Sequence, residues 1–357
     1  TGKVVNLEMD AGKGVHLRPY ESRLLKYSKC SCSEIGKGET EIRKSAPVKL
    51  VVDTSESKKV AIEGGNIFRL DQFRISRDKN NWYDVPVKTF IEQCAEQPCL
   101  KTEDYQFTGA FGIPKKISVR YPLAVTYQTF FEVKEVPKQC SLLMDRGAVK
   151  DTWHITLNGK EIAGEAFQSV FINDQNNIMA NITPLLKEGW NELEVDVTLT
   201  KDSDGIRDPL YLYGDFGVSE QEEGGTVSQK EEKERKQADG NRSIIRKPSE
   251  AEFRLDYIRG FPYYSGTFTF LTQIDMKEAP ERFDLELDIE DQCHECLEIS
   301  VNGVSVGTRA YSPYTWHGEG TLLRKGKNEL EIRLTNTLAP MLDGTWFDYE
   351  KHRLVTC

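Results

Sequence analysis

The feature that most constrains the fold is a pattern of turns and strands that occurs twice along the chain. The run KEGWNELEVDV at residues 187–197 has a counterpart in KGKNELEIRL at residues 325–334, and each copy begins within an LLxxG segment. Upstream, ITLNGKEIAG at residues 155–164 matches ISVNGVSVG at residues 299–307. Asn-Gly between alternating apolar residues is a strong hairpin signal, because both residues tolerate the positive φ of a tight turn. The sequence therefore predicts an internal structural duplication.

The spacing between the two halves of the pattern differs from one copy to the other. From the Asn-Gly turn to the NELE run, the second copy is seven residues shorter than the first. Changes of length fall in loops more readily than in strands, because loops lie on the surface. We therefore place this difference in the connection that precedes LLxxG, and expect the strands themselves to correspond.

Alternation of apolar and polar residues runs through most of the chain. Segments such as FRLDQFRIS, FTFLTQID and FDLELDIE are also enriched in β-branched and aromatic residues, and 38% of all residues are hydrophobic. Antiparallel sheets with one buried face produce this alternation. The predicted class is all-β, as tandem sandwiches. The one segment with helical periodicity is VKTFIEQCAEQ at residues 87–97.

Changes of composition suggest the domain limits. A chain of 357 residues suits two or three modules. Expected strands at residues 4–9, 14–17 and 23–27 are too few for a core, so residues 1–46 are interpreted as the end of a preceding β-domain, with additional strands of the next domain as the alternative. We expect sandwiches at 47–218 and 244–357. Residues 219–243 contain few large apolar side chains and are predicted to form a polar linker or mobile loop.

The charge pattern excludes some partners. The net charge is −10, and the basic residues form no stripe with interleaved aromatic residues, so nucleic-acid binding is not expected. No apolar stretch approaches the length of a membrane-spanning helix, so no membrane span is expected either.

The order of these motifs resembles a known family. NGxxxG followed by LLxxGxNELE is similar to the galactose-binding-like jelly-roll domains of large glycoside hydrolases, of the family 2 sugar-binding type. DPLYLYGDFGV at 208–218, GFPYYSGTFTF at 260–270 and NIFRLDQFRIS at 66–76 look like the accessory sandwiches of α-L-rhamnosidase-like enzymes. This resemblance implies tandem jelly rolls that partner a catalytic domain of the same parent chain. The family's catalytic acids would lie before residue 1, so none is assigned here.

Two other functions are compatible with the sequence. Jelly rolls also serve as autonomous carbohydrate-binding proteins of the lectin type. A complete hydrolase with an unrecognised site is the third reading, although no GxSxG motif is present and no pair among the 57 acidic residues stands out.

Candidate sugar-binding residues gather in two aromatic segments. Sugars bind to aromatic faces flanked by polar groups. FPYYSG at 261–266 and RAYSPYTWHGEG at 309–320 provide such groups: Tyr264, Tyr311, Tyr314, Trp316 and His317. The alternative, which packing statistics favour, is that these aromatic residues cover the edge of a sandwich.

Metal and thiol chemistry have weaker signals. The loop KDSDGIRD at 201–208 offers Asp202, Asp204 and Asp208 to a structural calcium ion, although a plain polar turn explains it more simply. No other cofactor is indicated. Eight cysteines are scattered along the chain, and CHEC at 293–296 lacks a second pair for zinc. This scatter favours a reducing compartment such as the cytoplasm over a secreted disulfide scaffold.

Overall fold

The computed structural model describes residues 46–54, 56–70, 72–83, 103–107, 115–119, 121–200, 204–219, 238–253, 258–288, 295–311, 313–342, 345–348 and 353–356. Within these ranges the chain consists of β-strands and turns, with short 3-10 helices and the four-residue α-helix α3 (Ala339–Leu342). The all-β prediction is confirmed. The strands expected before residue 46 and the helix expected at 87–97 lie outside the described residues. None of the described helices is long and apolar enough to cross a membrane.

The contacts divide the chain into two compact units. Unit 1 comprises residues 1–56 and 270–334, and unit 2 comprises residues 57–269 and 335–357. These limits differ from the predicted domain ranges, because segments distant in sequence share a unit. Strand β1 (Val48–Asp53) pairs in parallel with β21 (Arg282–Asp288). Strand β18 (Ala238–Ile245) begins inside the segment expected to be a linker, and it pairs with β7 (Leu123–Val133) of unit 2.

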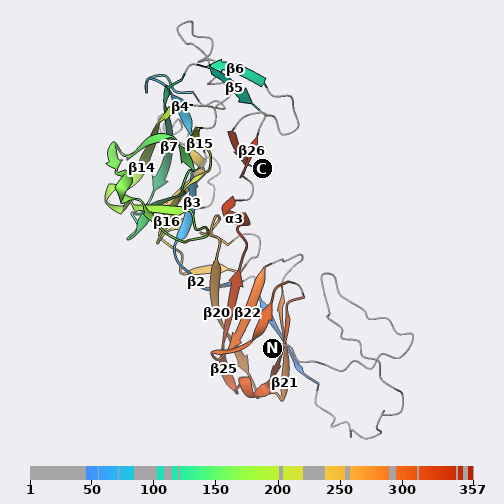
Figure 1. The fold of residues 1–357 in the computed structure, drawn as a ribbon. Coiled ribbons are helices and arrows are strands. Elements are labelled where there is room, and N and C mark those ends of the chain that lie inside the picture. Colours follow the sequence, from blue (N-terminus) through green and yellow to red (C-terminus); the bar gives the residue numbers. More distant parts are fainter. Residues whose placement is uncertain are drawn as a thin grey trace, which may run out of the picture. The chain divides into compact units, whose positions relative to one another are not determined.

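Unit 2 contains two main sheets (Figure 1). In spatial order, the first consists of β11 (Lys160–Ile162), β10 (Thr152–Leu157), β14 (Gly189–Leu199), β7, β18 and β17 (Gly217–Val218), with β4 (Arg74–Ser76) paired to β7 as well. The second consists of β12 (Gln168–Ser169), β13 (Asn177–Asn181), β8 (Cys140–Asp145), β16 (Leu210–Gly214) and β3 (Asn66–Leu70). Three two-stranded sheets are also described in this unit: β9 (Val149–Lys150) with β15 (Gly205–Ile206), β5 (Glu103–Phe107) with β6 (Lys115–Val119), and β26 (Thr345–Asp348) with β27 (Arg353–Thr356). Strand β2 (Ser57–Ile62) pairs with β19 (Glu250–Glu252).

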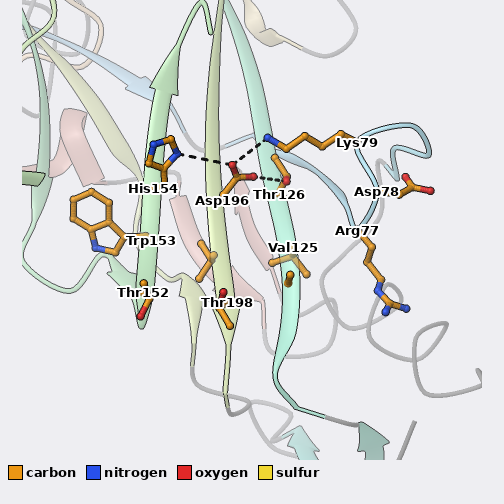
Figure 2. A pocket seen from close by; sticks show the side chains of 12 residues that line it. Arg77, Asp78, Lys79, Val125, Thr126, Thr152, Trp153, His154, Asp196 and Thr198 are labelled. Carbon is orange, nitrogen blue, oxygen red and sulfur yellow. Dashed lines mark hydrogen bonds and ion pairs between the residues drawn. The ribbon is translucent and has the colours of Figure 1, made fainter. Parts of the chain in front are cut away.

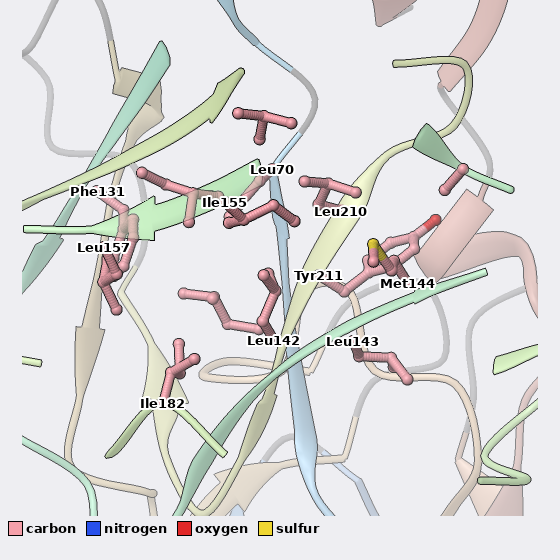
Figure 3. Close-up of a cluster of buried hydrophobic side chains, with 14 of the residues drawn as sticks. Leu70, Phe131, Leu142, Leu143, Met144, Ile155, Leu157, Ile182, Leu210 and Tyr211 are labelled. Carbon is pink, nitrogen blue, oxygen red and sulfur yellow. The ribbon is translucent and has the colours of Figure 1, made fainter. Parts of the chain in front are cut away.

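The alternation of the sequence explains which side chains form the core of unit 2. On β14 the side chains of Leu193, Val195 and Val197 are buried, while those of Glu194 and Asp196 alternate with them on the outer face. Strands β3 and β8 are buried along nearly their whole length. Side chains from both sheets meet in one apolar cluster, shown in Figure 3. Each buried aliphatic side chain there contributes about 1.5–3 kcal/mol to folding.

Unit 1 is built in the same manner from fewer strands. One sheet has the order β20 (Thr267–Met276), β25 (Gly326–Thr335), β22 (Cys296–Val301) and β23 (Val304–Arg309). The other has the order β1, β21 and β24 (Thr315–Glu319). Its core is formed by alternating side chains of both sheets, among them Phe283, Leu285, Ile299, Trp316, Leu330 and Ile332.

The predicted duplication is confirmed by the order of the elements. Unit 2 contains, in sequence order, β7, β8, β10, β11, β13, the 3-10 helix η2 (Thr183–Leu185) and β14, with β9, the 3-10 helix Gly164–Ala166 and β12 as additional short elements. Strands β20 to β24, the 3-10 helix η3 (Gly320–Leu322) and β25 follow in the same order in unit 1. Asn191 is the third residue of β14, which lies between β10 and β7. Asn328 is the third residue of β25, which lies between β22 and β20.

Candidate functional site

A polar pocket lies on the outer face of the first sheet of unit 2. Strand register places three side chains in one row across this face: Asp196 of β14 is opposite Thr126 of β7 on one side and His154 of β10 on the other. Because side chains alternate along each strand, all three point away from the apolar core. Figure 2 shows the row, with Lys79 reaching toward it from a loop.

The loop that follows β4 holds Lys79 over the sheet. The carboxylate of Asp78 accepts the backbone N–H groups of Asn80 at 2.9 Å and Asn81 at 2.7 Å, and Lys79 has a positive φ of 57°. These hydrogen bonds from the backbone, together with the Asn81 side chain, lower the pKa of Asp78 to about 2. The turn is therefore fixed by its own residues, and it directs the ammonium group of Lys79 toward β14.

Asp196 is the centre of the polar contacts. Its Oδ1 accepts the hydroxyl of Thr126 at 2.5 Å, and its Oδ2 accepts Lys79 Nζ at 3.0 Å. The same ammonium donates to Glu194 at 3.1 Å. Burial alone lowers the pKa of Lys79, but the hydrogen bonds and charges of Asp196 and Glu194 together outweigh burial and raise it.

His154 lies between two carboxylates. Its Nε2 is 3.2 Å from Glu161 Oε1, whereas its Nδ1 is 4.0 Å from Asp196 Oδ2, which is beyond the range of a direct hydrogen bond. About half of the side chain is exposed. Glu161 therefore holds the imidazole at Nε2, while Nδ1 faces Asp196 and the pocket.

The pocket has a volume of about 430 Å³. Its walls combine the loop of residues 77–79 with the three central strands of the sheet, and its lining residues are Arg77, Asp78, Lys79, Ala124, Val125, Thr126, Thr152, Trp153, His154, Asp196, Val197 and Thr198. Trp153 also packs edge-on against Phe167, with ring centroids 5.5 Å apart. Such a set offers ammonium, hydroxyl, imidazole and carboxylate groups to a small polar ligand.

A second polar row runs beside the pocket. Gln128 donates to Glu194 at 2.8 Å and to Glu192, and it accepts from the guanidinium of Arg74. The same guanidinium lies over the rings of Trp82, at 4.5 Å, and Phe130, at 5.0 Å. Burial, and then the charge of Glu194, raise the pKa of Glu192. This row packs the outer face of the sheet and fixes the glutamate that holds Lys79.

Three of the aromatic residues predicted to bind sugar lie in the interior. Trp316 and Tyr264 are 0% and 2% exposed, and Tyr314 is 5% exposed. Trp316 Nε1 donates to the carbonyl of Gly307 at 2.8 Å, and the hydroxyl groups of Tyr314 and Tyr264 donate to backbone carbonyls at 2.6 and 2.7 Å. Trp316 belongs to β24. These three side chains therefore pack in the protein interior, and their rings present almost no surface to a ligand.

The other two candidates are exposed. Tyr311 is 44% exposed, and His317 forms an ion pair or hydrogen bond with Asp284 at 2.7 Å on the surface of β24 and β21. They belong to unit 1, as do Tyr314 and Trp316, whereas Tyr264 belongs to unit 2. A sugar-binding role for Tyr311 and His317 stays a prediction.

The residues predicted to hold calcium have different partners. Asp204 is buried and accepts the backbone N–H and the hydroxyl of Thr200. Burial, and then the charge of Asp145, raise the pKa of Asp208. Asp202 lies outside the described residues. Across the ranges that the structure describes, no three His, Cys, Asp or Glu side chains are grouped so as to hold a metal ion.

Two cysteines fall within the described residues, and both are free thiols. Burial raises the pKa of Cys140 to about 12, which makes this thiol unreactive. Cys296 is partly buried at the start of β22. Cys293, the other cysteine of CHEC, lies outside the described residues.

Sequence reasoning missed the pocket. The strand pattern places His154 at a solvent-facing position of β10 and gives no indication of its neighbours. Alternation indicates that His154 and Asp196 both lie on outer faces. Their proximity depends on the register of β10 against β14, which periodicity does not give.

No family model matches the sequence, and no curated protein matches it. Solved structures that are similar over part of their length include a β-D-mannosidase from Dictyoglomus thermophilum, with 15% identity over 76% of this chain and 31% of the enzyme, at a TM-score of 0.30. A putative β-galactosidase from Bacteroides fragilis has 13% identity over 77% of this chain and 36% of its own, at a TM-score of 0.28. A β-glucuronidase from glycoside hydrolase family 2 has 13% identity over 77% and 27%, at a TM-score of 0.27. This chain thus spans about a third of the length of these glycoside hydrolases.

Proposed function

We propose that this chain is a non-catalytic accessory region of a glycoside hydrolase. Its jelly-roll sandwiches, of the galactose-binding-like type, would support a catalytic domain of the same parent protein and contact glycan. The observation that carries the proposal is the duplicated motif. The Asn-Gly turn, LLxxG and NELE occur in an order that resembles accessory sandwiches. In both units these segments form the same succession of strands. The finer assignment to an α-L-rhamnosidase-like parent rests on the sequence resemblance alone.

The bonding of the charged groups in the pocket supports a role without catalysis. A glycosidase commonly pairs a protonated carboxylic acid with an ionised carboxylate across one site. Both oxygens of Asp196 accept hydrogen bonds from within the protein, and the pKa of the other lining carboxyl group, that of Asp78, is lowered to about 2. The described carboxyl groups with a raised pKa include Glu192 and Asp208, which belong to different parts of unit 2: Glu192 is on β14, and Asp208 is near Asp145 of β8. Neither lines the pocket.

The test is turnover by the purified chain. We expect no hydrolysis above background on aryl α-L-rhamnosides, β-mannosides, β-galactosides or β-glucuronides, whereas the complete parent protein should hydrolyse at least one of them. Turnover by residues 1–357 that disappears when one Asp or Glu is replaced would overturn the proposal and identify a complete hydrolase.

A lectin-like protein that acts alone is the second candidate, and the preformed pocket of unit 2 favours it. The two candidates differ in their effect on a catalytic domain. Removing the sandwiches from the parent should lower the melting temperature of the catalytic domain if they are accessory, and should leave it unchanged if they bind carbohydrate independently.

A further inference from the structure

We infer that the pocket on the outer face of β7, β10 and β14 binds one neutral sugar residue, with His154 and Asp196 as its polar centre. The ligand class rests on the glycan contact proposed above, whereas the location and the selectivity come from the geometry. The volume of about 430 Å³ lies in the lower part of the range of small-molecule sites, which is about 300–1,000 Å³. A single ring with its substituents fits such a space better than an extended chain.

The gap between His154 and Asp196 is suited to a hydroxyl group. Nδ1 and Oδ2 are 4.0 Å apart, too far for a direct hydrogen bond but close enough for one oxygen atom to contact both. A neutral imidazole carries one N–H, which Glu161 accepts from Nε2, so Nδ1 and Asp196 Oδ2 are both acceptors. An oxygen atom in this gap must therefore bring a proton, which a ligand hydroxyl does and an ionised carboxylate or phosphate oxygen does not. The pair therefore selects a hydroxyl over an anionic oxygen.

The groups around this gap are held before any ligand binds. Thr126 and Lys79 fix Asp196, and Glu161 fixes the far nitrogen of His154. The Lys79 ammonium has three N–H groups, of which two are directed at Glu194 and Asp196. The third is available to a second ligand hydroxyl, and the side chains of Thr152 and Thr198 line the same pocket. Several hydrogen-bonding groups around a small cavity fit the adjacent hydroxyls of a sugar, and preorganisation reduces the entropic cost of binding.

The charges favour a neutral sugar over an acidic one. Among the lining residues, Arg77 and Lys79 are balanced by Asp78 and Asp196. Glu194 and Glu161 contact Lys79 and His154 from beside the pocket, so the surroundings are net negative. The ammonium of Lys79 is shared between two carboxylates and has little attraction left for an anion. A uronic acid or a sugar phosphate would bring its charge next to Asp196 and is expected to be rejected.

The experiment measures binding to the purified full chain by NMR titration. The probes are the methyl glycosides of mannose, galactose, glucose and rhamnose, with sodium glucuronate and glucose 6-phosphate as charged counterparts. We expect millimolar binding of at least one neutral glycoside, with signals of Thr126, His154 and Asp196 perturbed, and no binding of the two anions. Asp196→Asn and His154→Ala should each weaken binding at least tenfold, and thermal melting should show that both variants are folded.

A matched control is provided by the second exposed histidine–aspartate pair, His317 and Asp284 of unit 1, which are 2.7 Å apart with no gap for a hydroxyl. Asp284→Asn should leave binding at the unit 2 pocket, read from the signals of Thr126 and His154, unchanged. The inference is overturned if none of the neutral glycosides binds, if an anion binds best, or if Asp284→Asn weakens binding as much as Asp196→Asn. Because the readout is binding, these outcomes are distinct from the turnover that would overturn the proposed accessory function.

Discussion

The side-chain amide of Asn158 donates to the side-chain oxygen of Asn191 at 2.8 Å, and Asn302 makes the same bond to Asn328 at 2.9 Å. In both copies the first asparagine also donates to the carbonyl of the last residue of a 3-10 helix, Leu185 or Leu322. The second asparagine closes the turn before its strand through three further bonds to backbone groups. The repeated sequence segments thus form the same hydrogen-bonded connection between a hairpin and a long strand in both units.

Replacing either buried asparagine should destabilise its own unit. Asn191 and Asn328 are 0% and 1% exposed, so their loss leaves several backbone groups without partners in the interior. We expect Asn191→Ala and Asn328→Ala each to lower the free energy of unfolding by about 2–3 kcal/mol. Urea denaturation measures this, with exposed Asn176→Ala as the control, which should stay within about 0.5 kcal/mol of wild type. Equal stability of all three variants would mean that the asparagine pair does not hold the motif.

The Asn-Gly turns should be sensitive to backbone strain alone. Gly159 and Gly303 have φ of +73° and +78°, and a Cβ at either position would meet no atom within 4 Å. Gly159→Ala should therefore cost about 1–2 kcal/mol through conformation and not through a clash. Gly164→Ala is the matched control, because that position is equally open and its φ is not in the left-handed region. If both variants melt at the same temperature, the positive φ is not what selects glycine at the turn.

Trp316 should act on stability and not on ligand binding. Its side chain is fully buried in unit 1, so Trp316→Ala removes core packing and is expected to lower the free energy of unfolding by about 3–5 kcal/mol. Tyr311→Ala, at an exposed position of the same segment, should leave stability nearly unchanged. Thermal unfolding of the two variants distinguishes these roles. A stable Trp316→Ala protein that had lost affinity for glycan would restore the sugar-contact interpretation of this residue.

The loop that holds Lys79 should loosen in acid. The pKa of Asp78 in the folded protein is about 2, below its ordinary value of 3.8, so its ionised form stabilises the loop. That contribution is present above pH 4 and is lost as the pH falls from about 4 through 2. An NMR titration of the Asp78 carboxyl, read together with the amides of Asn80 and Asn81, measures the transition. In Asp78→Asn these amides should no longer change over this interval, and an unchanged titration would show that another group controls them.

The sequence alone determined the features that depend on neighbouring residues. Alternation along KEGWNELEVDV and its twin predicts strands, and Asn-Gly predicts the turns between them, because backbone sterics and side-chain direction are local properties. The order of these signals is sufficient to predict the duplication and the all-β class. The alternation also indicates that His154 and Asp196 occupy outward-facing positions, because the side chains of Ile155 and Val195 beside them point into the core.

Only the tertiary structure decided which of these residues meet. His154 and Asp196 are neighbours because β10 and β14 pair in one register, and a shift of one residue would turn every side chain to the other face. Trp316 is buried because β24 pairs with β21, and Lys79 reaches the pocket because the loop after β4 lies over a strand more than a hundred residues away in sequence. Pairing between distant strands depends on the packing of the whole core, so the duplication could be derived from short segments, whereas the pocket could not.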